Sequence, residues 1–341
     1  MRYTIEKCTS SDICAAMDFF GENHDAGHVL AANRRFVDWQ YYVPETDNYN
    51  ILTAKDESGI LGLFAYIPNT FFDCGIPHER KFIWTANWLA KKDHKGFAGL
   101  DLLYSMPKLE NCENLGVVGL TAEAGKFYQK TGYRVGKLRQ YFFVNRNVDE
   151  FRVLSVESME LRAKNLNADF RGFSRIWWIK SMSGFRNSPL ISEYFDTAAP
   201  YKSLAFFENK YIKNPFYKYF AYGIEAGGGL AAIIICRVVS HNGANVVRLV
   251  EYAGCAEYLA DASLQDILDE HDAEYLDFYC AGIPHELLIQ AGFLLNTGDF
   301  IIPNYFEPFQ NTNVEIAYAY KFPECYIFKG DGDRDHPRNV N

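Results

Sequence analysis

The sequence contains no run of Lys or Arg, and its basic residues are in the minority. The 34 Lys and Arg residues stand against 43 Asp and Glu residues, which gives a formal net charge of −9. Because duplex nucleic acids and anionic membrane surfaces attract basic faces, this balance predicts neither kind of partner. The sequence also lacks an apolar run of the roughly 20 residues that a membrane helix needs, and its start lacks the apolar block of a signal peptide. We therefore expect a cytoplasmic protein.

Signatures of metal sites and disulfide frameworks are absent too. The eight cysteines form no Cys-x-x-Cys pair, so we interpret them as reduced core residues. His24 and His28 are four residues apart but lack the Glu of a His-Glu-x-x-His site. Asp331-Gly-Asp-Arg-Asp335 resembles the start of a calcium loop, but His336 stands where that loop needs glycine. The sequence predicts no metal site.

The composition is typical of a folded chain. Its 341 residues allow two domains. Hydrophobic residues make up 48% and charged residues 23%, which is ordinary for globular proteins. The aromatic share of 16% is high and favours pockets lined by rings.

A similar order of elements recurs in the two halves of the chain. Pro44 precedes two strand-like runs joined by a turn at Gly59, and Pro215 precedes a second such pair with its turn at Gly229. Both patterns predict β-hairpins. We interpret the chain as one duplicated module, with the copies joined within residues 146–175. Chance similarity of two hairpins is the alternative.

Residues 88–103 predict a strand, a glycine-bearing loop and a helix in succession. Gly96, Ala98 and Gly99 are small enough for backbone N–H groups to approach a diphosphate, and a helix N-terminus adds the positive end of its dipole. The nearby lysines are Lys91, Lys92 and Lys95. The P-loop and Rossmann sequences are both missing. The pattern favours an anion site of another kind, and an ordinary tight turn is the alternative.

A second pattern follows the next predicted strand. Thr121-Ala-Glu-Ala-Gly-Lys-Phe-Tyr-Gln-Lys-Thr-Gly-Tyr133 resembles the helix signature of the GNAT superfamily of acyl-CoA N-acyltransferases, with Thr121 where Asn is usual. Asp93-His-Lys-Gly-Phe-Ala-Gly-Leu100 resembles the coenzyme loop of the same family, with Lys95 in place of Arg and Ala98 in place of Gly. The two motifs occur in the order that the family shows.

The resemblance implies an α/β fold, with a mixed sheet and flanking helices, and an enzyme that takes an acyl group from acyl-CoA. In this family the loop amides bind the pyrophosphate of coenzyme A, the preceding strand pairs with the pantetheine arm, and a tyrosine matching Tyr128 protonates the departing thiolate. The implied cofactor-binding residues are Trp88, Leu89, Ala90, Lys95, Gly96, Phe97, Ala98, Gly99, Thr121 and Ala124. A core tyrosine is the alternative reading of Tyr128.

The resemblance covers residues 3–145 well, and it extends only weakly to residues 200–320. In the second copy Leu288 stands where the catalytic tyrosine is expected, and no glycine loop is present. We therefore expect two tandem GNAT-like domains. Residues 1–150 would bind acyl-CoA. Residues 151–341 would be degenerate, bind no coenzyme and contribute the site of the second substrate, an amino sugar.

The acceptor is narrowed by a further resemblance. A tandem chain with this charged tail resembles the nucleotide-sugar N-acyltransferases of bacterial lipopolysaccharide and O-antigen pathways. Those enzymes transfer an acetyl or 3-hydroxybutanoyl group to the amine of a dTDP- or UDP-linked amino-deoxysugar. The predicted substrate-binding residues are His28, Tyr305, Asp331, Asp333 and Arg334; for the tail, a solvated terminus is the alternative. The general base stays open among Glu123, His28 and the tail carboxylates.

Two other functions stay open. A Fem-type aminoacyl transferase is also a doubled GNAT and would use aminoacyl-tRNA and a cell-wall precursor. The acidic balance and the coenzyme-type loop argue against it. A catalytically dead GNAT module that only binds is favoured by Ala98 and Leu100 in the loop.

Overall fold

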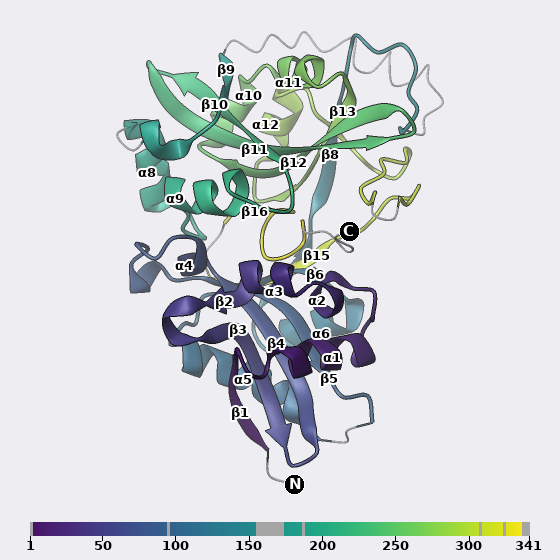
Figure 1. Ribbon diagram of the computed structural model, residues 1–341. Coiled ribbons are helices and arrows are strands. Elements are labelled where there is room, and N and C mark those ends of the chain that lie inside the picture. Colours follow the sequence, from purple (N-terminus) through teal and green to yellow (C-terminus); the bar gives the residue numbers. More distant parts are fainter. Residues whose placement is uncertain are drawn as a thin grey trace. The chain divides into compact units, whose positions relative to one another are not determined.

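The chain forms two compact units, each built on one mixed sheet (Figure 1). The computed structural model describes residues 3–93, 96–154, 174–185, 188–306, 309–322 and 325–335. Unit 1 consists of Met1–Val135, Tyr318–Phe322 and Gly332–Asn341, and unit 2 consists of Gly136–Ala317 and Pro323–Asp331.

The sheet of unit 1 has the strand order β1-β3-β4-β5-β6-β15-β7, with β2 paired to β3. Its strands are β1 (Thr4–Thr9), β2 (Tyr42–Val43), β3 (Asn48–Asp56), β4 (Gly59–Pro68), β5 (Ile83–Ala90), β6 (Leu115–Leu120), β7 (Arg134–Lys137) and β15 (Ala317–Lys321). Its α-helices are α1 (Ile13–Asn23), α2 (Val29–Ala32), α3 (Arg34–Tyr41), α4 (Asn69–Phe72), α5 (Ala98–Glu110) and α6 (Ala122–Lys130). β5 and β6 are parallel, whereas β4 is antiparallel to both β3 and β5.

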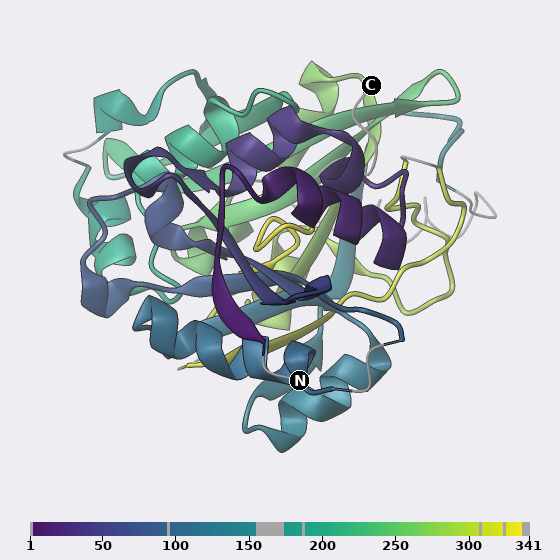
Figure 2. The ribbon, with the colours of Figure 1, turned by 60° about the horizontal axis from the view of Figure 1, so that its bottom comes forward.

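Helices cover both faces of this sheet. Leu63 and Ala65 of β4 line an apolar hollow together with residues of α1 and α3, which Figure 1 shows in front of the strands. On the other face a Cβ at Gly62 would lie 2.9 Å from Leu102 Cδ1 of α5. Side chains alternate along a strand, so β4 separates an α3 face from an α5 face. Figure 2 shows β1 at the edge of the sheet.

The two predicted hairpins are both present. In unit 1, Asp56 Oδ1 accepts a hydrogen bond of 2.8 Å from the Ser58 amide, and Gly59 follows with φ of +113°. A residue with a side chain would be strained in that conformation, which explains the glycine at this turn. In unit 2 the corresponding turn joins β10 and β11 and ends at Gly229.

The sheet of unit 2 has the strand order β14-β8-β13-β12-β11-β10-β9, with β16 paired to β13. Its strands are β8 (Arg139–Val144), β9 (Ile176–Ile179), β10 (Tyr219–Ala226), β11 (Gly229–His241), β12 (Ala244–Ala253), β13 (Ala273–Ala281), β14 (Leu294–Leu295) and β16 (Ile327–Phe328). The α-helices among its described residues are α8 (Pro189–Thr197), α9 (Leu204–Phe207), α10 (Ala256–Ala260), α11 (Leu264–Glu270) and α12 (His285–Gln290). The runs of fully buried Ile and Val in β11 and β12 explain why this sheet carries the larger core.

The two sheets exchange strands. β8 follows β7 after the single residue Leu138 but lies in the sheet of unit 2, and β15 of the C-terminal part lies between β6 and β7 in unit 1. The division into 1–150 and 151–341 therefore differs from the structure, in which unit 1 ends at Val135 and regains two later segments. Hydrophobic period alone does not reveal this, because a strand has the same period in either sheet.

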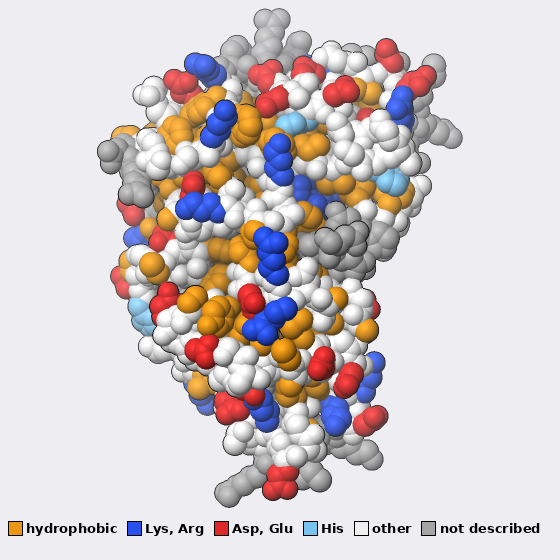
Figure 3. All heavy atoms as spheres, in the orientation of Figure 1, with side chains coloured by type: hydrophobic (Ala, Val, Ile, Leu, Met, Phe, Trp, Pro, Cys, Tyr) orange, Lys and Arg blue, Asp and Glu red, His pale blue; other side chains and the backbone are white. Residues whose placement is uncertain are grey.

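Within the described part of the chain, no helix is both long and apolar enough to span a bilayer. On the face drawn in Figure 3, acidic and basic side chains of the described residues are interspersed with apolar and neutral ones.

Candidate active site in unit 1

The centre of the candidate site is the point where β5 and β6 part. Within the described strands they pair at three positions, from Ile83 opposite Leu115 to Thr85 opposite Val117, and then diverge. β5 runs on to Ala90 along β4. Its edge facing β6 therefore presents backbone N–H and C=O groups beyond Thr85, which is what an extended ligand needs for strand-like pairing.

A bulge in β5 lies at the start of this gap. Phe64 of β4 pairs with Trp88 and Tyr66 pairs with Thr85, so Ala65 alone stands opposite the two residues 86 and 87. An extra residue reverses the alternation of side chains. Thr85 and Asn87 consequently point to opposite faces of the sheet, where a regular strand would point them to the same face.

The predicted coenzyme loop leads from β5 into α5. Trp88 and Leu89 are half-buried, Ala90, Gly96 and Phe97 are exposed, and Ala98 and Gly99 are buried in the first turn of the helix. Lys95 lies outside the described residues. Phe97 occupies the N-cap position and provides no side-chain cap. The first amides of α5 are thus available to an anion at the positive end of the helix dipole.

Trp88 fixes the start of α5 against β5. Its indole Nε1 donates a hydrogen bond of 2.8 Å to the Gly99 carbonyl. A Cβ at Gly99 would lie 3.3 Å from that nitrogen and 3.4 Å from Ala90 Cβ. The close approach of helix and strand explains the need for glycine here, and it supplies a reason for the small residues of the loop besides ligand binding.

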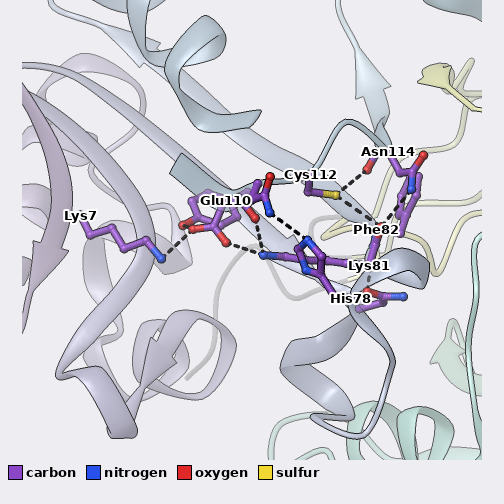
Figure 4. A network of polar contacts seen from close by, with 10 residues as sticks. Lys7, His78, Lys81, Phe82, Glu110, Cys112 and Asn114 are labelled. Atoms are coloured by element: carbon purple, nitrogen blue, oxygen red, sulfur yellow. Dashed lines mark hydrogen bonds and ion pairs between the residues drawn. The ribbon is translucent and has the colours of Figure 1, made fainter. Parts of the chain in front are cut away.

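The other end of α5 is held by a buried carboxylate. Figure 4 shows Lys7 and Lys81 approaching Glu110 from opposite sides, at 2.6 Å and 2.8 Å. The Tyr66 hydroxyl donates to the same carboxylate at 2.6 Å. Burial alone would raise the pKa of Glu110, but these three hydrogen bonds outweigh burial and hold it at about 2. The network fixes α5 along its axis, so the position of its N-terminus is set from both ends.

Tyr128 lies on the α5 face at the vertex of the gap. It is 2% exposed, and its hydroxyl is hydrogen-bonded to the side chain of Thr85, the last β5 residue that pairs with β6. Burial raises the pKa of the phenol, partly offset by that hydrogen bond. The phenol therefore keeps its proton at neutral pH, as a group that donates a proton must.

The Lys-x-Gly-Tyr part of the motif has a structural reason of its own. Gly132 adopts φ of +87° after α6, and the Tyr133 amide donates to the Tyr128 carbonyl at 3.1 Å. This is the glycine-dependent helix ending that satisfies the last carbonyls. At the other end of α6, Thr121 Oγ1 accepts from the Ala124 amide at 3.2 Å. The two predicted cofactor-binding residues Thr121 and Ala124 thus form a helix cap beside the open end of β6.

The C-terminal segment reaches the same gap from the α3 face. Asn87 Nδ2 donates to Asp333 Oδ2 at 3.0 Å, and the Asn87 side chain is also hydrogen-bonded to the Tyr41 hydroxyl of α3. Arg334 packs against β6, because a Cβ at Gly119 would lie 2.9 Å from its Cδ. Residues 333 and 334 are half-buried. The segment therefore contacts both strands beyond the point where they part.

The apolar hollow on the α3 face adjoins Tyr41. It is small, with a cavity volume of about 20 Å³, and its lining is apolar apart from the phenol. The lining residues are Ile13, Ala16, Met17, Phe20, Leu30, Val37, Tyr41, Ile51, Leu63 and Ala65.

Three predicted substrate residues have other roles in the structure. Asp331 is 0% exposed, and its carboxylate is bound by Lys202 Nζ at 2.7 Å and by the Phe328 amide at 2.8 Å. Its carboxylate thus holds the turn together, and a role of Asp331 in binding a substrate stays a prediction. His28 caps α2 by accepting from the Leu30 amide at 3.2 Å. Tyr305 lies in unit 2 with its ring 5.2 Å from the Lys329 ammonium.

Unit 2 has a matching gap, and its own chain fills it. β12 and β13 are parallel and pair up to Leu249 opposite Phe278. Beyond that point the Gly330 amide donates to the Val250 carbonyl at 2.7 Å, and the Lys329 amide donates to the Tyr279 carbonyl at 3.3 Å. The edges that a pantetheine arm would use are thus occupied. Leu288, at the position of the expected tyrosine, is a core residue of α12 with 0% exposure.

Sequence reasoning missed the residues that join the tail to the sheet. Asn87 and Thr85 are the polar members of an otherwise apolar strand, and that interruption was the available signal. Tyr41 gave none, because a tyrosine at the end of an amphipathic helix is ordinary. Among the described residues, no three His, Cys, Asp or Glu side chains gather as a metal site would require.

The fold of the chain is similar to those of solved structures of acyltransferases. A GCN5-related N-acetyltransferase from Anabaena variabilis superposes with a TM-score of 0.56 at 10% identity, covering 94% of this chain and 72% of that one. One from Kribbella flavida gives 0.54 at 10% identity, covering 94% and 70%. A probable N-acyltransferase from Enterococcus faecalis gives 0.53 at 8% identity, covering 93% and 72%. No family model matches the sequence, and no curated protein matches it.

These likenesses confirm the predicted fold class. The chain has an α/β fold of two GNAT-like domains, each a mixed sheet flanked by helices.

Proposed function

We propose that the chain is an N-acyltransferase that binds one acyl-CoA in unit 1. The observation that carries the proposal is the parting of β5 and β6 at Thr85, with Tyr128 at the vertex and the uncapped start of α5 beyond it. A strand edge for an extended arm, helix amides for a diphosphate and a protonated phenol suit the three parts of a coenzyme A thioester.

The chain's own groups would divide the work as follows. The β5 edge from Trp88 to Ala90 would align the pantetheine arm, and the amides from Gly96 to Gly99, with Lys95, would hold the pyrophosphate. A β5 amide would polarise the thioester carbonyl. Tyr128 would give its proton to the departing thiolate. The coenzyme supplies the activated acyl group.

The acceptor in this proposal is the amine of a dTDP- or UDP-linked amino-deoxysugar used in lipopolysaccharide O-antigen synthesis in the cytoplasm. It is supported by the tail resemblance and by the place of Asp333 and Arg334, which offer a carboxylate for the ammonium or hydroxyls and a guanidinium for the diphosphate. The acyl group in this proposal is acetyl or 3-hydroxybutanoyl.

Calorimetric titration with coenzyme A and acetyl-CoA tests the proposal first. We expect micromolar binding at one site per chain. Thiol release from acetyl-CoA is then measured with a panel of dTDP- and UDP-linked amino sugars, with the matching sugars that carry a hydroxyl in place of the amine as controls. Absence of coenzyme binding would refute the proposal and leave the Fem-type and binding-module hypotheses. Coenzyme binding without turnover on any amino sugar would refute the acceptor.

A further inference from the structure

The C-terminal segment and Tyr128 approach the gap in unit 1 from opposite faces of the sheet. Asn87 holds Asp333 on the α3 face, and Thr85 holds the Tyr128 hydroxyl on the α5 face. Thr85 and Asn87 are two residues apart on β5, a distance of about 6–7 Å along a strand. The bulge between them turns their side chains to opposite sides. A reacting carbon in the gap would therefore have a carboxylate on one side and a phenol on the other.

Asp333 is fixed as a reacting group must be. Asn87 Nδ2 donates to its Oδ2 at 3.0 Å, and the same side chain is hydrogen-bonded to Tyr41, whose hydroxyl also accepts from Gln40 Nε2 at 2.8 Å. Tyr41 is 0% exposed and Gln40 is 3% exposed, so this chain of hydrogen bonds ends on buried side chains of α3. Asp333 itself is half-buried and thus remains in reach of a ligand.

The turn that carries Asp333 is anchored just before it. Gly332 precedes it with φ of +63°, and a Cβ there would lie 3.6 Å from Trp84 Cβ of β5. On the other side of Asp333, a Cβ at Gly119 of β6 would lie 2.9 Å from Arg334 Cδ, so the residues before and after Asp333 both approach the sheet of unit 1.

We propose that Asp333 binds the acceptor amine of the proposed acyltransferase and takes its proton. This inference rests on the proposed function. The neutral amine nitrogen attacks the thioester carbonyl carbon, so that a C–N bond forms and the C–S bond breaks. The N–H proton passes to the Asp333 carboxylate, and the Tyr128 proton passes to the coenzyme thiolate. Asp333 then releases its proton to solvent, and Tyr128 regains one from solvent.

The assignment selects one base from the candidates that the sequence left open. Glu123 is exposed on the first turn of α6, and His28 is engaged as a helix cap. Asp331 is sealed in its ion pair with Lys202. Asp333, by contrast, accepts a hydrogen bond from Asn87 in the bulge of β5.

The test compares Asp333→Asn with Asp335→Asn in the full chain. Asparagine keeps an acceptor oxygen for Asn87, so the tail stays docked, and Asp335 is a half-buried carboxylate two residues further along the same turn. We expect Asp333→Asn to lower kcat for acetyl transfer to the nucleotide-linked amino sugars about 100-fold or more. Its acetyl-CoA affinity and thermal midpoint should match those of the wild type, and Asp335→Asn should keep its activity.

A second variant separates chemistry from docking. Asp333→Ala leaves room for a small carboxylate, so added formate should restore part of its rate, whereas formate should not change the rate of Asp333→Asn. Equal activity of Asp333→Asn and Asp335→Asn, or lost coenzyme binding in Asp333→Asn, would overturn the role of Asp333 and leave the proposed function intact. A wild type that binds no coenzyme or acylates none of the amino sugars would overturn the proposed function, and this inference with it.

Discussion

At the residue scale, Tyr128 shows how a motif can have both a structural and a chemical reason. Its carbonyl accepts the Tyr133 amide that ends α6, while its hydroxyl meets Thr85 at the vertex of the gap. The helix ending would work with any residue at position 128, because it uses backbone atoms. The helix ending does not explain why residue 128 has a buried phenol that is bonded to a neighbouring hydroxyl.

Replacing Tyr128 by Phe should lower kcat for acyl transfer by about 100-fold with unchanged acetyl-CoA affinity, since the hydroxyl acts only as the thiolate leaves. Tyr133→Phe is the matched control, because its ring stands 4.8 Å from that of Tyr128 and its hydroxyl has no part in the proposed step. Single-turnover kinetics and calorimetry measure the two quantities. An unchanged kcat in Tyr128→Phe would remove the phenol from the mechanism.

The lowered pKa of Glu110 predicts how the stability of the protein depends on pH. Its pKa is held at about 2, below the ordinary 4.5, so its ionised form stabilises the fold fully above pH 4.5. That stabilisation is lost as the pH falls toward 2. Glu110→Gln should therefore lower the free energy of unfolding by about 2 kcal/mol near neutral pH, since it leaves two lysines without their carboxylate.

Urea unfolding from pH 7 to pH 3 checks this. The difference in free energy of unfolding between the wild type and Glu110→Gln should shrink as the pH falls below 4.5. Glu123→Gln, which removes an exposed carboxylate of α6, should differ from the wild type by less than about 0.5 kcal/mol throughout. A difference in unfolding free energy that stays constant with pH would show that the ion pairs do not provide the stabilisation.

Residue patterns predicted part of the site and not the rest, for physical reasons. The strand, the loop and the motif at Tyr128 are local, so their spacing is written in consecutive residues. The contact of Asp333 with Asn87 joins positions 246 residues apart, and no local pattern encodes such a pairing. The bulge is likewise hidden, because it depends on the register of β5 against β4.

At the element scale, the turn from β16 to Asp331 fills the gap of unit 2 at a position where only glycine fits. A Cβ at Gly330 would lie 2.6 Å from both the Tyr211 hydroxyl and the Val250 carbonyl. The buried ions beside the turn form one cluster, in which Lys202 bonds to both Glu251 and Asp331 and the neutral Tyr211 hydroxyl donates to Glu251 at 2.6 Å. Burial alone would lower the pKa of Lys202, but the two carboxylates outweigh it and raise it.

Gly330→Ala should therefore destabilise the protein by about 3 kcal/mol, because the added methyl meets a backbone carbonyl that cannot move away. Gly184→Ala is the control, since nothing lies within 4 Å of the position of its Cβ. Denaturant unfolding of the two variants measures the difference. Equal stabilities would mean that the turn does not sit in the gap of unit 2.

The start of α5 carries a prediction on coenzyme binding. In Gly99→Val the side chain would push the Trp88 indole from its place over the first turn. We expect acetyl-CoA affinity to fall more than tenfold with the far-ultraviolet circular dichroism unchanged. Gly75→Val, a change in an exposed turn before β5, is the control. Retained affinity in Gly99→Val would place the coenzyme elsewhere.

At the scale of the whole molecule, the two copies of the fold differ in what occupies their diverging strands. In the described residues of unit 1, β5 pairs with β6 only up to Thr85, whereas unit 2 fills its gap with Lys329 and Gly330. We therefore expect a stoichiometry of one coenzyme A per chain. Titration of a chain of known concentration measures it, and a value of two would show that the turn leaves unit 2 on binding.

The exchange of β8 and β15 also bears on how the protein is made. β15 stands between β6 and β7, so the sheet of unit 1 stays incomplete until residues 317–321 have left the ribosome. During most of translation β6 and β7 lack the strand that separates them, and open strand edges of this kind invite mispairing. A gene cut at codon 150 would encode neither sheet in full. Although the two copies are alike in fold, neither sheet can therefore be completed without residues from the other half of the chain.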